Sequence, residues 1–104
     1  MKPLHVETPY GPLRGMDAKT GRQTFAKLDL RQPTGSFKIR GVGRLCQQLK
    51  AEGARAFVSS SGGNAGYAAA YAGQALGVPV TVVVPSTPYS AVLRNSGASS
   101  VPVM

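Results

Sequence analysis

The run from Gln32 to Gly41 places a lysine, Lys38, at the predicted start of a helix, where a cation is electrostatically unfavourable. The aligned N–H groups of a helix N-terminus are effectively positive and favour carboxylates, yet no Asp or Glu occurs between Pro33 and Leu49. An ammonium near this end and partly out of water is biased toward losing its proton, and a neutral amine can attack a carbonyl. The pattern indicates Lys38 as a candidate nucleophile.

The glycine-rich run from Ser61 to Gly66 joins a predicted strand to the start of another helix. Its exposed N–H groups could bind an anion such as a carboxylate or phosphate, although the loop taken alone is better explained by an ordinary glycine-rich turn capped by Asn64. It matches neither a Walker loop nor the Gly-x-Gly-x-x-Gly spacing. With Lys38 at the same sheet edge, however, the two motifs form an amine and carboxylate pair suited to an amino acid.

The remaining chemistry-bearing residues point to no second site. Cys46, the single cysteine, is interpreted as a small buried hydrophobe rather than a catalytic thiol, because the only histidine, His5, lies in the distant N-terminal segment. One Cys and one His without clustering predict no metal site. Because one cysteine forms no internal disulfide and no apolar run could span a bilayer, we expect a cytoplasmic protein without a membrane segment.

The formal net charge of +8 raises the question of nucleic-acid binding. Residues 1–55 contain 11 of the 12 Lys and Arg residues and all four acids, so the basic charge lies mainly in this part. It is not interleaved with aromatic residues, and no helix-turn-helix, ribonucleoprotein or zinc-finger pattern accompanies it. We interpret the charge as a solvated face and predict no nucleic-acid partner.

Two regions are expected to position these motifs. Pro and Gly interrupt residues 1–23, which predicts an irregular, extended arm, and residues 24–104 predict an α/β segment. Alternation from Thr24 to Leu30 predicts a first strand. A helix is predicted from Ser36 to about Ala51, and its apolar stripe consists of Val42, Leu45, Cys46 and Leu49.

The rest of the chain alternates strands and helices. The predicted elements are a strand at Arg55–Ser59, a helix at Asn64–Leu76 ended by Gly77, a strand at Val78–Val84, a short helix at about Tyr89–Asn95 and a strand near Ser100–Val103. The Val-rich strand is typical of a central parallel strand covered on both faces. This order predicts an open parallel sheet with flanking helices, with both candidate loops at the carboxyl edge.

The segments Pro-Thr-Gly-Ser-Phe-Lys-Ile-Arg-Gly at 33–41 and Ser-Ser-Gly-Gly-Asn-Ala-Gly at 60–66 together resemble the fold-type-II pyridoxal-phosphate enzymes. The likeness extends from about Leu4 to Ala98 and is greatest to the serine and threonine dehydratase family, within it to serine dehydratases. Cysteine synthases resemble the chain less, because their lysine segment commonly has Ser-x-Lys-Asp-Arg. Threonine dehydratases share Ser-Phe-Lys but tend to have Ala-Gly-Asn-His after the loop serine.

The resemblance implies an L-serine, or L-threonine, ammonia-lyase that eliminates the β-hydroxyl to give a 2-oxo acid and ammonia without a metal. Lys38 would hold the aldehyde of pyridoxal 5'-phosphate as an imine and remove the Cα proton. Phe37 would pack by the pyridine ring, and Asn64 would hydrogen-bond the ring hydroxyl. The substrate carboxylate would be held by Ser61, Gly62, Asn64 and Ala65. A full-length enzyme of this kind is expected to be a homodimer.

Family members also have parts that do not occur between Ala65 and Met104: a glycine-rich loop for the cofactor phosphate, a Ser or Cys partner for the pyridine nitrogen, and a larger second domain. We therefore expect the sequence to encode the N-terminal part of such an enzyme. The alternatives are a catalytically inactive α/β binding module, or another fold-type-II enzyme such as a threonine dehydratase or a cysteine synthase.

Overall fold

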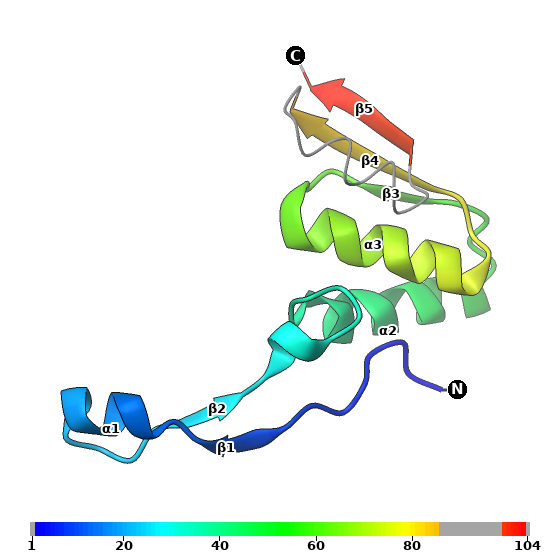
Figure 1. Cartoon of the computed structure of the whole chain (residues 1–104). Helices are drawn as coiled ribbons and strands as arrows, with labels where there is room; N and C mark the ends of the chain where they lie inside the picture. Colours follow the sequence, from blue (N-terminus) through cyan, green and yellow to red (C-terminus); the bar gives the residue numbers. More distant parts are fainter. Residues whose placement is uncertain (1, 86–98, 104) are drawn as a thin grey trace.

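The computed structural model describes residues 2–85 and 99–103, which form a parallel sheet, two long helices and a projecting N-terminal arm (Figure 1). The sheet contains β3 (Phe57–Ser59), β4 (Val80–Pro85) and β5 (Ser99–Val103) in the order β3-β4-β5, and both neighbouring pairs are parallel. The predicted α/β class, the parallel sheet and its central Val-rich strand are therefore confirmed.

Helix α3 (Gly63–Leu76) lies between the sheet and helix α2 (Lys38–Ala51), and it contacts both layers (Figure 1). Its small residues make this close packing possible. A Cβ atom added at Gly73 would overlap the Val80 side chain and lie 2.7 Å from the Val78 carbonyl oxygen. Because packed interiors leave no room for such an atom, α3 requires glycine at its point of closest approach to the sheet.

The hydrophobic core lies between α3 and one face of the sheet. Val80, Val82 and Val84 are buried on this face, whereas the intervening Thr81 and Val83 are half-buried. On the neighbouring strand β3, Val58 is 73% exposed. Among the described residues, β4 is thus buried on one face and half-buried on the other, so the predicted coverage of both faces is complete on one face only.

The helix predictions hold closely. Helix α2 begins at Lys38 rather than Ser36 and ends at Ala51 as predicted, and Cys46 is buried as predicted. Leu45, another member of the predicted apolar stripe, lies on the same side of α2 but is 54% exposed. Helix α3 and the last strand are confirmed, and Gly77 ends α3 in the left-handed conformation with a φ of 70°. The helix predicted at 89–95 lies outside the described residues.

The N-terminal arm is more regular than predicted. Strand β1 (Tyr10–Pro12) pairs antiparallel with β2 (Phe25–Lys27), and helix α1 (Arg14–Thr20) connects them. The irregular arm and the parallel strand from Thr24 to Leu30 were therefore wrong predictions: β2 is short, pairs outside the main sheet and is followed by the 3₁₀ helix η1 (Asp29–Arg31).

None of the helices in the described residues combines the length and the apolar character that crossing a membrane requires.

Candidate active site

Lys38 is the first residue of α2 and follows a tight turn. The Gly35 N–H donates to the Gln32 carbonyl oxygen at 2.8 Å, and Gly35 has a φ of +77°, which glycine adopts without strain. Pro33, the second residue of this turn, has a fixed φ. The turn delivers the chain to Phe37, which occupies the N-cap position without a side-chain capping bond. The turn closes at Gly35, and the helix begins three residues later with Lys38.

The Lys38 side chain is exposed, and its Nζ lies 5.5 Å from the centroid of the Phe37 ring. The partial burial that we expected for this amine was therefore a wrong prediction. Phe37 is also 61% exposed, so its ring is accessible to a ligand. An ammonium this close to a ring face is attracted to it, so Phe37 holds the amine beside an accessible apolar surface.

The acid that α2 lacks in its own first turn comes from another element. Asp29 of η1 accepts hydrogen bonds from Arg40, at 2.9 Å from Nε and 3.1 Å from Nη2. This is the only ion pair between residues of the described ranges 2–85 and 99–103. The first turn of α2 thus contains one paired cation, Arg40, and one that has no carboxylate partner there, Lys38.

Two adjoining hollows connect this lysine to the loop before α3. Phe37 and Lys38 line an open hollow of about 410 Å³ together with Val42 and Leu45. Val42 and Leu45 also line a second hollow of about 540 Å³, whose wall on the α3 side includes Ser59, Ser60, Ser61 and Ala65. Four of the six predicted site residues therefore line these neighbouring hollows: Phe37 and Lys38 line the first, and Ser61 and Ala65 line the second. Gly62 and Asn64 line neither of them.

The loop from β3 to α3 is held in shape by its own hydrogen bonds. The Ser59 hydroxyl donates to the Ser61 carbonyl oxygen at 3.1 Å, and the Ser61 hydroxyl donates to the Gly62 carbonyl oxygen at 3.2 Å. Gly63 has a φ of +58°. A Cβ at Gly66 would lie only 2.5 Å from the Ser61 carbonyl oxygen. Glycine is therefore needed for the loop to fold back over the helix start.

The start of α3 leaves backbone donors free. Gly62 is the N-cap, with no side-chain capping bond, so the predicted cap at Asn64 was wrong. The Gly66 N–H donates to the Gly62 carbonyl oxygen at 3.3 Å, which leaves the N–H groups of residues 63–65 without an acceptor inside the helix. Ala65 is half-buried and lines the second hollow, whereas Asn64 is exposed and does not.

Ser36 is a further candidate, which belongs to the lysine motif but was not among the predicted site residues. Its Oγ is buried and has no hydrogen-bond partner among the described residues. A buried hydroxyl without a partner costs about 1–3 kcal/mol, and contact with a bound group is one way to satisfy it. The only sequence signal for it was its place two positions before Lys38.

These features fit a planar cofactor bound to an amine. An accessible amine, an exposed aromatic ring, an unpartnered hydroxyl and small residues at the start of α3 together provide a covalent anchor, an apolar face and a polar contact. No group of three or more His, Cys, Asp or Glu side chains that could hold a metal occurs in the part of the chain that the structure describes. Burial raises the pKa of the Cys46 thiol, which disfavours the nucleophilic thiolate.

Comparisons with known proteins agree with this chemistry. The model of the family described as "Pyridoxal-phosphate dependent enzyme" matches residues 1–96. The chain is 48% identical over 101 residues to the L-serine dehydratase/L-threonine deaminase of Homo sapiens, which covers 94% of this chain and 31% of that protein. It is 47% identical to the serine dehydratase-like protein of Homo sapiens over 92% of this chain and 30% of that protein.

The fold is similar to that in a crystal structure of a fungal L-serine ammonia-lyase from Rhizomucor miehei, with a TM-score of 0.83 and 29% sequence identity. This match covers 99% of the present chain and 34% of the fungal chain. The present chain therefore spans about a third of the length of the proteins it resembles, and it corresponds to their N-terminal part.

Proposed function

The chain belongs to the pyridoxal-phosphate-dependent enzyme family, and we propose that it supplies the lysine and the carboxylate-binding loop for β-elimination of L-serine or L-threonine to a 2-oxo acid and ammonia. The observation on which this depends most is the pair of adjoining hollows, which share Val42 and Leu45 and are bordered by Lys38 and Ser61. An amine and an anion-binding loop along one groove suit an amino acid. The names of the similar proteins support the same substrates.

Pyridoxal phosphate, when bound, supplies an electron sink that makes the Cα–H bond of an amino acid acidic. Lys38 would hold this group through Nζ and, when free, would accept the Cα proton. Phe37 would pack against the ring, and Asn64 would contact its hydroxyl. We add Ser36, which lies two positions before Lys38, because its buried Oγ lacks a hydrogen-bond partner among the described residues.

The start of α3 would bind the substrate carboxylate. Its unused N–H groups and the positive end of the helix dipole favour an anion. The assigned residues are Ser61, Gly62, Asn64 and Ala65. Because the loop serines already donate to loop carbonyls, their main contribution would be to hold the backbone donors in place. The proposed setting is a homodimeric cytoplasmic enzyme.

Covalent trapping tests this function. The chain would be mixed with pyridoxal phosphate, reduced with borohydride and mapped by peptide mass spectrometry. We expect the adduct mainly at Lys38 among the five lysines of the chain. Lys38→Ala should abolish the preferred site, and Lys19→Ala, a change of another exposed lysine, should leave it intact.

The same samples separate the lyase from the alternatives. Release of 2-oxo acid and ammonia from L-serine or L-threonine, lost in Lys38→Ala, supports the lyase and ranks its two substrates. An adduct distributed over all lysines, with no change in Lys38→Ala, would instead favour the inactive α/β module and overturn the proposal.

A further inference from the structure

The carboxylate of Asp29 lies where the arm meets α2, and its oxygens have four donors. Arg40 donates from Nε and Nη2, the Thr8 hydroxyl donates at 2.7 Å, and Gln32 Nε2 donates at 3.0 Å. We call Thr8, Asp29, Gln32 and Arg40 the Asp29 clamp. Thr8 and Gln32 are 5% and 4% exposed, so the clamp is largely closed to solvent on the arm side.

Gln32 extends the clamp to the backbone of the arm. Its Oε1 accepts from the Val6 N–H at 2.9 Å, and its Nε2 donates to the Val6 carbonyl oxygen at 2.8 Å. The Gln32 side chain thus makes the two hydrogen bonds to Val6 that the backbone of a neighbouring strand would otherwise make. Because amides have fixed donor and acceptor positions, this pairing sets where Gln32, and the turn that follows it, lies relative to the arm.

Lys38 lies between two points that are tethered to the same carboxylate. Gln32 begins the turn that precedes it, and Arg40 follows it within the first turn of α2. Inside this stretch the Gly35 N–H donates to the Gln32 carbonyl oxygen, and the Arg40 N–H donates to the Phe37 carbonyl oxygen at 3.0 Å. The backbone on both sides of Lys38 is therefore fixed.

The clamp also determines which cation is paired. Hydrogen bonds from Arg40 above all, and then from Thr8 and Gln32, hold the pKa of Asp29 well below its usual range. The bond to Asp29 raises the pKa of Arg40 in turn. Because a guanidinium binds a carboxylate with two parallel bonds and an ammonium does not, Asp29 selects Arg40. Lys38 is left free to point along its hollow beside Phe37.

We propose that Asp29 is a positioning residue for Lys38: through Arg40 and Gln32 it fixes the first turn of α2 and so directs the lysine amine into the hollow. Asp29 touches no reacting atom in this role. The inference rests on the proposed function of Lys38, and its two tests are chosen so that either idea can fail alone.

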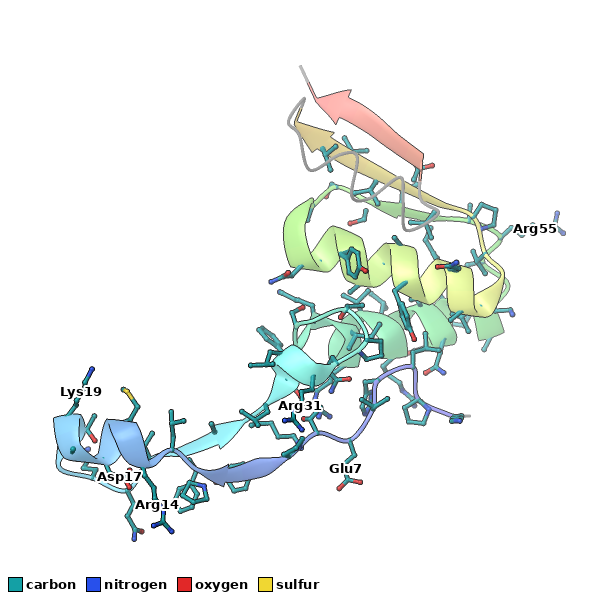
Figure 2. All side chains as sticks on the ribbon, in the orientation of Figure 1. Glu7, Arg14, Asp17, Lys19, Arg31 and Arg55 are labelled. Carbon is teal, nitrogen blue, oxygen red and sulfur yellow. The ribbon has the colours of Figure 1, made fainter. Side chains whose placement is uncertain are left out.

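The first test needs no cofactor. Amide hydrogen exchange would be compared between the wild-type chain, Asp29→Asn and the matched control Asp17→Asn. Asp17 accepts the Thr24 N–H at 2.7 Å and lies in α1, at the far end of the arm from α2 (Figure 2). We expect exchange at Gly35 and Arg40 to rise about tenfold in Asp29→Asn alone, with α3 unchanged. No rise at either amide would overturn the clamp.

The second test measures the consequence for the amine. The ratio of borohydride-trapped adduct at Lys38 to that at Lys19 should fall about tenfold in Asp29→Asn, because a misplaced amine reacts less selectively. Asp29→Glu, which retains a carboxylate, should restore part of the ratio, and Asp17→Asn should not change it. A general loss of fold would also lower this ratio, but it would raise hydrogen exchange in α3 as well, which the first test measures.

The outcomes separate the two ideas. A ratio that stays constant although exchange rises would overturn positioning by Asp29. A wild-type chain without any preference for Lys38 would refute the proposed function, while the exchange experiment would still decide whether the clamp orders the turn.

Discussion

At the first turn of α2 a ligand would meet side-chain groups, whereas at the first turn of α3 it would meet backbone groups. At α2, an exposed amine and a paired guanidinium emerge from a turn that polar side chains hold against the arm. At α3, the ligand would meet N–H donors of a glycine-rich loop, with no side-chain cap. The same structural unit, a helix N-terminus, thus provides a nucleophile in one case and an anion site in the other.

The two turns are also stabilised differently. The α2 turn depends on hydrogen bonds between distant segments, such as the pairs Thr8–Asp29 and Val6–Gln32. The α3 turn depends on close approach, because Gly66 leaves no room for a methyl group against Ser61 and Val82. It follows that α3 should respond most to added volume, and α2 should respond most to changes of charge.

The largest expected effect is that of Gly66→Ala. The added Cβ would lie 2.5 Å from the Ser61 carbonyl oxygen and 3.0 Å from Val82 Cγ1, so the loop or the helix must shift. We expect the free energy of unfolding in urea to fall by about 3 kcal/mol.

Gly41→Ala in α2 is the matched control for this change. A Cβ at this exposed helical position meets nothing within 4 Å, and alanine favours helix over glycine, so stability should rise by about 0.5–1 kcal/mol. Equal losses in the two variants would contradict the contrast between the helices.

Changes of pH should act on the α2 side. The pKa of Asp29 is lowered in the folded chain, mainly by its hydrogen bonds from Arg40, so its ionised form stabilises the fold. This stabilisation is complete above the unfolded pKa of about 3.9 and is lost as pH falls below it toward the folded pKa. The stability difference between wild type and Asp29→Asn should therefore shrink on acidification below about pH 4. A difference that does not change with pH would count against the clamp.

The smallest expected effect is that of Ser61→Ala. This exposed side chain makes a single hydrogen bond, to the Gly62 carbonyl oxygen, so its loss should cost about 0.5 kcal/mol of stability. Binding of phosphopyridoxyl-L-serine, a stable conjugate of cofactor and substrate, should weaken about fivefold by calorimetry. Ser60→Ala, in the neighbouring position, is the control, and equal weakening there would remove the specific role of Ser61.

The helices and the central strand could be predicted, because local residue patterns determine them. The periodicity of α2, the small residues of α3 and the Val run of β4 gave these elements within a few residues. The arm could not be predicted in this way, because β1 is stabilised by pairing with β2 across the intervening α1. Leu45 has the right helical phase for burial, but the described residues leave it 54% exposed.

The candidate site shows the same division. Lys38 and the run from Ser61 to Gly66 could be found from residue types alone, although their functional roles remain predictions. The acid that pairs with Arg40 could not, because Asp29 precedes the turn and only the folded chain brings the two together. The free Oγ of Ser36 is likewise a property of burial, which no local pattern reveals.

The central claim is that the two helix starts form one site for an amino acid joined to the cofactor. Amide chemical shifts of the ¹⁵N-labelled chain, titrated with phosphopyridoxyl-L-serine, test it most directly. The account predicts that the shifts concentrate in residues 36–40 and in residues 61–66 with a single affinity. Shifts confined to one of these segments, or spread over the arm, would contradict it.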